Sequence, residues 1–223
     1  MPTILRDARA EAVLTRLYEI SERQEAEEKA NPVRNADLPP GPDFESARKK
    51  YLSDKLVALE PDKAEFCYLQ CRALGAQRIV EIGTSYGVST IYLAAAIRDN
   101  GGKGIVIGTE YEPEKCAAAR ANWAEAGVSE YIDLREGDLR ETIGDTGGPV
   151  DFVLMDIWTP MALPALELLI PQLKKGAVII SDNTIFAAKG YAAFLARIKA
   201  ENSGFRTVTL PFSGGLEYTV WEG

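Results

Sequence analysis

The chain has 223 residues, 46% of them hydrophobic, and a net charge of −8 at pH 7. It contains three cysteines and no histidine, which excludes Ser-His-Asp and Cys-His catalysis, histidine-ligated zinc and imidazole proton shuttles. The acidic balance argues against binding to a nucleic acid backbone, and no apolar run approaches the roughly 20 residues of a membrane helix.

The N-terminal region is expected to be mainly helical. Apolar residues recur at helical spacing over 4–20, and the charged run 22–29 is expected to be the solvated end of that helix. Four prolines in 31–42 predict a loop, which is either a lid over a substrate or a plain linker. Further helices are predicted over 44–59 and over 61–75, because proline suits a first helical turn and glycine a helix C-terminus.

The pattern changes after this region, because short apolar strands then alternate with helices. Strands are predicted over 78–82, 104–109, 131–135, 150–155 and 177–180, and helices over 89–97, 113–126, 163–173 and 191–200. Such alternation indicates an α/β fold with a mostly parallel sheet covered by helices on both faces. The final strands, 205–210 and 216–221, have no helix between them and are expected to form an antiparallel hairpin at the sheet edge.

A glycine-bearing loop follows the first strand and indicates a nucleotide-like cofactor. Glu81 lies just before this loop, and Gly83 and Gly87 would let the backbone approach a ligand closely at the carboxyl end of the sheet. The G-x-G-x-x-G pattern of dinucleotide sites is absent. Glu81 would repel a pyrophosphate but suits a cationic ligand such as S-adenosylmethionine, so an NAD-dependent dehydrogenase is disfavoured.

Two further acidic residues follow the next strands. Glu110 ends the second strand, where an acidic side chain typically accepts from ribose hydroxyls, although it could also complement the N-terminus of the next helix. Asp138 follows the third strand and could accept from an adenine amino group or cap a helix; the sequence leaves both open.

Hard oxygen ligands follow two other strands. Asp156 ends the strand over 150–155, and Asp182 and Asn183 end the strand after it. Adjacent strand ends lie about 5 Å apart, so these side chains could converge on Mg²⁺, Ca²⁺ or Mn²⁺. The Asp182-Asn183 pair alone could instead form an Asx turn.

Taken together, these motifs resemble the cation-dependent O-methyltransferases of the catechol and caffeoyl-CoA type, which are class I S-adenosylmethionine enzymes. The resemblance covers about 60–223 and implies a Rossmann-like fold. It implies that Glu81, Gly83, Ser89, Glu110, Asp138, Asp156 and Trp158 line the cofactor site, with Glu81 near the amino acid end of the cofactor. Trp158 could instead be a core aromatic residue.

The resemblance also implies a mechanism. A cation on Asp156, Asp182 and Asn183 would chelate two adjacent oxygens of a small acceptor, so Asp156 is the expected catalytic residue. Members usually carry a lysine base three positions after the first metal aspartate, where this chain has Thr159. Three alternatives stay open: the metal alone acidifies the acceptor, Lys189 substitutes for the lysine, or the activity differs. A different activity would be transfer to another acceptor, such as an amine or a metal-independent hydroxyl, or binding of S-adenosylmethionine without catalysis.

The remaining expectations concern organisation and partners. We expect one domain over 1–223, in which 1–59 is a helical cap with dimerisation and lid roles and 60–223 is the S-adenosylmethionine-binding core. The apolar stripe of the first helix has no obvious partner in the chain, which suggests a homodimer. The charged N-terminus is not expected to be a secretory signal, and the three cysteines are expected to be reduced in a cytoplasmic protein that binds neither nucleic acid nor membrane.

Overall fold

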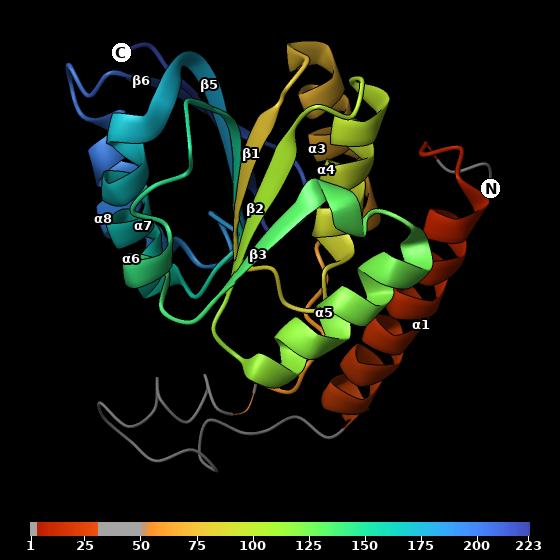
Figure 1. The fold of residues 1–223 in the computed structure, drawn as a ribbon. Helices are drawn as coiled ribbons and strands as arrows, with labels where there is room; N and C mark the ends of the chain where they lie inside the picture. The colour runs from red at the N-terminus through yellow and green to blue at the C-terminus, as the bar shows by residue number, and fades with distance from the viewer. Residues whose placement is uncertain (1–3, 31–50, 52) are drawn as a thin grey trace.

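A seven-stranded sheet forms the centre of the computed structural model, which describes residues 4–30, 51 and 53–223 (Figure 1). Its strand order is β3-β2-β1-β4-β5-β7-β6. The strands are β1 (Arg78–Ile82), β2 (Ile105–Glu110), β3 (Ile132–Glu136), β4 (Val150–Met155), β5 (Leu173–Asp182), β6 (Phe205–Leu210) and β7 (Leu216–Trp221). All neighbours among β1 to β5 pair in parallel, and β7 pairs antiparallel with both β5 and β6. The predicted mostly parallel sheet with a C-terminal hairpin is confirmed.

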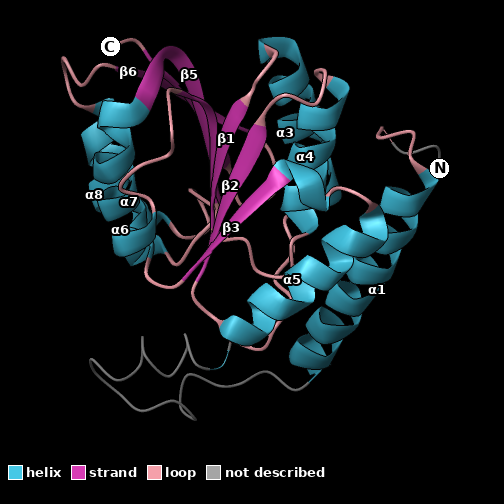
Figure 2. Ribbon diagram, in the orientation of Figure 1, coloured by secondary structure: helices cyan, strands magenta, loops and turns pink. Residues whose placement is uncertain are grey.

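Helices cover both faces of the sheet (Figure 2). The described α-helices are α1 (Ala8–Ala30), α3 (Pro61–Leu74), α4 (Val88–Asp99), α5 (Pro113–Ala126), α6 (Leu139–Thr142), α7 (Ala162–Leu169) and α8 (Ala188–Lys199). Short 3-10 turns are η2 (Ser129–Tyr131), η3 (Thr159–Met161) and η4 (Ile170–Gln172). One apolar cluster joins α1, α3, α4 and α5 to the sheet, and a second joins α6, α7 and α8 to its other face. None of the described helices has the length and apolar character needed to span a membrane.

Proline and glycine set the limits of α3 and α5 as the sequence predicts. Each helix begins with a proline in its first turn and ends before a left-handed glycine, Gly75 or Gly127. Gly75 has a φ of 58° and donates to the carbonyl of Arg72, and the next residue, Ala76, donates to Cys71. These bonds satisfy the last carbonyls of the helix and turn the chain towards β1.

The helix predicted over 163–173 is too long at its C-terminal end. The α-helix ends at Leu169, a 3-10 turn follows, and β5 begins at Leu173 rather than at 177. Pro171 lies at this point and lacks the N–H that a continuing α-helix needs. Leu173 pairs with Val150, so β5 takes up residues that the sequence assigned to the helix.

The helix predicted over 44–59 is wrong over 53–59, although Tyr51 is helical. Residues 53–59 form a turn, a bend and irregular chain, whereas 44–50, 52 and the loop predicted over 31–42 lie outside the described residues. Three hydrogen bonds attach this segment to α1: Gln24 accepts from Leu56 N–H, Ser21 donates to Leu56 O, and Tyr18 donates to Leu59 O. Tertiary contacts with α1 therefore replace the internal bonds of a helix.

The apolar stripe of α1 has its partner within the same chain, contrary to the expectation from the sequence. Val13, Leu14 and Leu17 are buried in the cluster that includes α4 and α5. Arg9 donates to the carbonyls of Ala124 and Glu125 at the C-terminal end of α5. The stripe thus gives no support to a subunit contact.

Candidate active site

A narrow cleft opens at the carboxyl end of the sheet, between the loop after β1 and the segment before α3. It is lined by Leu56, Val57, Ala58, Leu59, Gly83, Thr84, Ser85, Tyr86, Val88, Ser89 and Asp156. The ends of β1 and β4 are neighbours, because Ile82 pairs with Met155. The cleft therefore lies where open parallel sheets bind their ligands.

Gly83 allows the loops after β1 and β4 to touch. Its φ is 98°, and a Cβ at this position would lie 2.0 Å from the carbonyl oxygen of Asp156. The Asp156 N–H also donates to the carbonyl of Ile82 at 3.0 Å. Only glycine fits this conformation and this spacing, so Gly83 fixes the relative position of the two loops.

Glu81 lies fully buried beneath the cleft and binds its own loop. Its carboxylate accepts from the hydroxyls of Thr84 at 2.9 Å, Ser89 at 2.7 Å and Thr90 at 2.5 Å. Burial raises the pKa of Glu81 to about 7, and the three hydroxyls oppose that rise. Two of the residues predicted to hold the cofactor, Glu81 and Ser89, therefore contact each other and hold the loop in shape.

Because of this raised pKa, Glu81→Gln is expected to change how stability depends on pH. The carboxyl titrates near 4.5 when unfolded and near 7 when folded, so wild type loses stability as pH rises between these values. The loss is on the order of 3 kcal/mol. The free energy of unfolding of Glu81→Gln minus that of wild type should rise over this interval and be flat above it, as measured by urea unfolding. A pH-independent difference would contradict this assignment.

Glu110 holds the same loop from the end of β2. One carboxylate oxygen accepts from Ser85 N–H at 2.8 Å, and the other accepts from the N–H groups of Tyr111 and Glu112. Ser85 has a φ of 51°, and its buried hydroxyl has no hydrogen-bond partner in the described chain. A hydroxyl without a partner in the lining of a cleft fits a bound cofactor.

Asp138 caps α6, the short helix that the sequence did not predict. It accepts from Arg140 N–H at 2.9 Å and forms an ion pair with the guanidinium of the same residue. The structure thus gives Asp138 the capping role, and its contact with an adenine stays a prediction.

The structure brings Asp156 and Asp182 together on neighbouring strands. Met155 pairs with Ser181 in the parallel β4–β5 ladder, so the two aspartates follow at equivalent positions. Burial and the mutual repulsion of the two carboxylates raise the pKa of Asp156. Asn183 has a φ of 57°, and its amide nitrogen donates to Asp182 Oδ2 at 2.7 Å. The three residues predicted as metal ligands therefore lie together at the carboxyl ends of β4 and β5.

Lys63 is a residue of this site that sequence reasoning missed. Its side chain is fully buried, and its Nζ lies 2.6 Å from Asp182 Oδ1 and 2.8 Å from Glu60 Oε2. Burial lowers the pKa of Lys63, but the hydrogen bonds and charges of Asp182 and Glu60 outweigh burial and raise it above its ordinary value. The side chain is therefore an ammonium ion among the acidic residues of the site.

The donor types at this edge fit a hard divalent cation. No group of three or more His, Cys, Asp or Glu side chains with metal-binding geometry occurs in the described ranges. Two carboxylates with the amide oxygen of Asn183 are nevertheless the ligand types that Mg²⁺, Ca²⁺ and Mn²⁺ prefer. The carboxylate of Asp156 accepts no hydrogen bond from the part of the chain that the structure describes, and Asp156 lines the cleft. This carboxylate is therefore available to a ligand.

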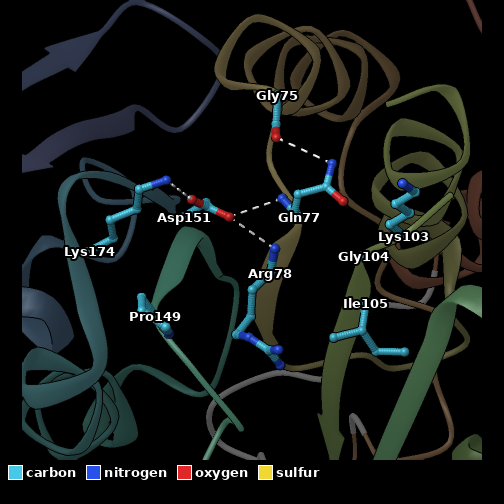
Figure 3. A pocket seen from close by; sticks show the side chains of 9 residues that line it. All are labelled: Gly75, Gln77, Arg78, Lys103, Gly104, Ile105, Pro149, Asp151 and Lys174. Atoms are coloured by element: carbon cyan, nitrogen blue, oxygen red, sulfur yellow. Dashed lines mark hydrogen bonds and ion pairs between the residues drawn. The ribbon is translucent and has the colours of Figure 1, made fainter. Parts of the chain in front are cut away.

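A larger cavity, of about 410 Å³, lies at the opposite, amino-terminal edge of the sheet (Figure 3). Asp151 in its wall accepts from Lys174 at 2.8 Å and from the N–H groups of Gln77 and Arg78. These polar groups pair with one another. The glycine loop after β1 and the pair Asp156 and Asp182 lie at the opposite, carboxyl ends of the strands. This cavity is therefore not the candidate active site.

Comparison with known proteins shows what the chain is similar to. Residues 80–184 match the methyltransferase domain family. Over 130 residues the chain is 35% identical to catechol O-methyltransferase from Mycobacterium tuberculosis, and the aligned region covers 58% of each of the two chains. The chain is therefore similar to methyltransferases, and the match to a methyltransferase domain lies over residues 80–184. It is also 27% identical over 137 residues to caffeoyl-CoA O-methyltransferase 1 from Zea mays, covering 59% of this chain and 52% of that one.

The chain is also similar in fold to solved structures. The crystal structure of cofactor-bound Rv0187 from MTB superposes with a TM-score of 0.73 at 24% identity, and covers 100% of this chain and 94% of that one. In sequence, by contrast, the chain spans 58% and 52% of the lengths of the two curated relatives named above.

Thr159 stands where the resemblance places a lysine base in these methyltransferases, and it packs against α8. A Cβ on Gly190 would lie 2.0 Å from Thr159 Oγ1, so the two elements are in close contact here. Lys189, which precedes Gly190 in the chain, is exposed on the surface. Trp158 is partly exposed and belongs to neither apolar cluster, so it is not the buried core aromatic of the alternative interpretation.

Proposed function

We propose that this methyltransferase domain transfers a methyl group from S-adenosylmethionine to a hydroxyl oxygen of a small catechol-like or vicinal-oxygen acceptor, with a divalent cation such as Mg²⁺. The observation that carries the proposal is the adjacency of Asp156 and Asp182 beside the glycine loop of β1. The names of the two curated relatives support the acceptor class.

The residues of the chain would bind and orient the reactants. The loop of Gly83 and Ser89, held by Glu81 and Glu110, would bind the cofactor, which supplies an electrophilic methyl group on its sulfonium. Asp156, Asp182 and Asn183 would hold the cation, which when bound lowers the pKa of an acceptor hydroxyl and orients two neighbouring oxygens. The apolar side chains of Leu56, Leu59 and Val88 would exclude water from the cleft.

A methylation assay tests this function: the protein is incubated with labelled S-adenosylmethionine and a panel of catechols, in the presence of either Mg²⁺ or EDTA. We expect methylation of vicinal diols with Mg²⁺ and its loss with EDTA, measured by product mass and label. Restoration by added Mg²⁺ is the control for damage by the chelator. Methylation that is unaffected by EDTA would contradict the role of the cation.

A different acceptor is the second candidate, and Thr159 is the observation that favours it. Without the lysine base, an amine or a hydroxyl that needs no metal could be the acceptor. This candidate predicts that turnover is unchanged in Asp182→Ala. A third candidate, a protein that binds S-adenosylmethionine without catalysis, predicts calorimetric binding and no turnover on any acceptor.

The homodimer and the cytoplasmic location expected from the sequence remain predictions. Light scattering at micromolar concentration tests the first, and a monomer would contradict it. Fractionation of the source cells tests the second.

A further inference from the structure

Lys63 occupies an unusual position for a lysine, because its whole side chain is buried at the acidic edge of the site. It comes from the first turn of α3, whereas its main partner Asp182 ends β5 and is 2% exposed. Its second partner, Glu60, precedes α3 and has a side chain that is 43% exposed. The ammonium therefore bridges a buried carboxylate and one that reaches solvent.

The surroundings of Lys63 explain why a cation is needed there. Asp156 and Asp182 follow the paired residues Met155 and Ser181, so their carboxylates lie at neighbouring strand ends and repel each other. Buried charges without a counter-charge are strongly destabilising. Among the described residues, Lys63 is the basic side chain that forms an ion pair with Asp182.

We propose that Lys63 is the resident counter-cation of this site, a positioning residue that holds Asp182 and offsets its charge before a divalent cation binds. The inference rests on the proposed cation site and adds a consequence for it. The ammonium contacts Oδ1 of Asp182, so a divalent cation would share that carboxylate with Lys63. Lys63 therefore lowers the affinity of the site for the cation while keeping the cation-free protein folded.

Lys63→Met separates these two effects, because it keeps most of the side-chain volume and removes the charge. In EDTA its thermal midpoint should fall by about 10 °C relative to wild type. Millimolar Mn²⁺ should restore much of that loss, whereas the wild-type midpoint should change little. The affinity for Mn²⁺, measured by electron paramagnetic resonance, should rise on the order of tenfold, because a nearby positive charge has gone.

Lys174→Met is the matched control. It removes the same charge from an ion pair of similar length, 2.8 Å to Asp151, but with a side chain that is 63% exposed and lies at the other edge of the sheet. Exposed pairs contribute little to stability. This variant should therefore change neither the response to Mn²⁺ nor the affinity for it.

The double variant Lys63→Met/Asp182→Asn keeps the test decisive if Lys63→Met folds poorly. Removing the carboxylate together with its counter-charge should raise the midpoint in EDTA above that of Lys63→Met. A double variant as unstable as Lys63→Met, or a Mn²⁺ affinity that Lys63→Met leaves unchanged, would overturn the inference. Absence of Mn²⁺ binding in wild type and variant alike would count against the cation in the proposed function, and the double variant would still decide the counter-charge role.

Discussion

Asp156→Asn is expected to lower methyl transfer by about a hundredfold or more while leaving the protein at least as stable as wild type. The carboxylate lines the cleft and, in the proposed function, binds the cation that activates the acceptor. Burial and the charge of Asp182 raise its pKa, so its ionised form is unfavourable in the fold. A neutral amide of the same shape removes that repulsion together with the activity. Turnover at saturating S-adenosylmethionine and Mg²⁺ and the thermal midpoint measure the two effects.

Asp151→Asn is the control at the other end of the same strand, and the opposite result is expected. Burial raises the pKa of Asp151, but Lys174 and two backbone N–H groups outweigh burial and lower it below its ordinary value. Its loss should cost about 2 kcal/mol of unfolding free energy and leave turnover per folded molecule unchanged. If both variants lost activity in proportion to stability, the special role of Asp156 would be refuted.

The sequence predicts the sheet well because the signals for it are local. Most of the parallel strands contain a short apolar run, with β3 as the exception, and Gly75 and Gly127 mark helix ends with the conformation that the structure contains. The error over 163–173 has a local cause too, since the predicted helix includes Pro171, which lacks the N–H that a continuing helix needs. Local sequence signals could not reveal the error over 53–59, because the conformation of that segment is set by hydrogen bonds to α1.

The distinction between local signals and tertiary contacts also applies to the candidate active site. Asp156 and Asp182 could be placed together because consecutive parallel strands end at one edge, and the structure has them there. Lys63 could not be found, because it lies 119 positions from Asp182 and no spacing rule joins the start of α3 to the end of β5. The contacts of Glu81 with three hydroxyls also depend on the exact course of the loop after β1. Charge pairing across the fold is a tertiary property that a motif does not carry.

Gly83→Ala is expected to abolish cofactor binding and to lower the free energy of unfolding by about 3 kcal/mol or more. The added methyl group would meet the carbonyl oxygen of Asp156 at 2.0 Å, and backbone atoms cannot yield as a flexible side chain does. The loops after β1 and β4 would have to separate. Because Asp156 lies on the second loop, this movement would displace a proposed ligand as well as the cofactor loop. Calorimetry with S-adenosylmethionine and urea unfolding measure the two losses.

Gly176→Ala separates this clash from the cost of a left-handed backbone. Gly176 has a φ of 86°, similar to that of Gly83, but a Cβ there would meet nothing within 4 Å. The control should therefore lose only about 1 kcal/mol and bind S-adenosylmethionine as wild type does. If the two variants were equally destabilised and both bound the cofactor normally, the contact between the loops would have no part in forming the site. A loss confined to Gly83→Ala would show that the close approach of β1 and β4 is what shapes the cofactor cleft.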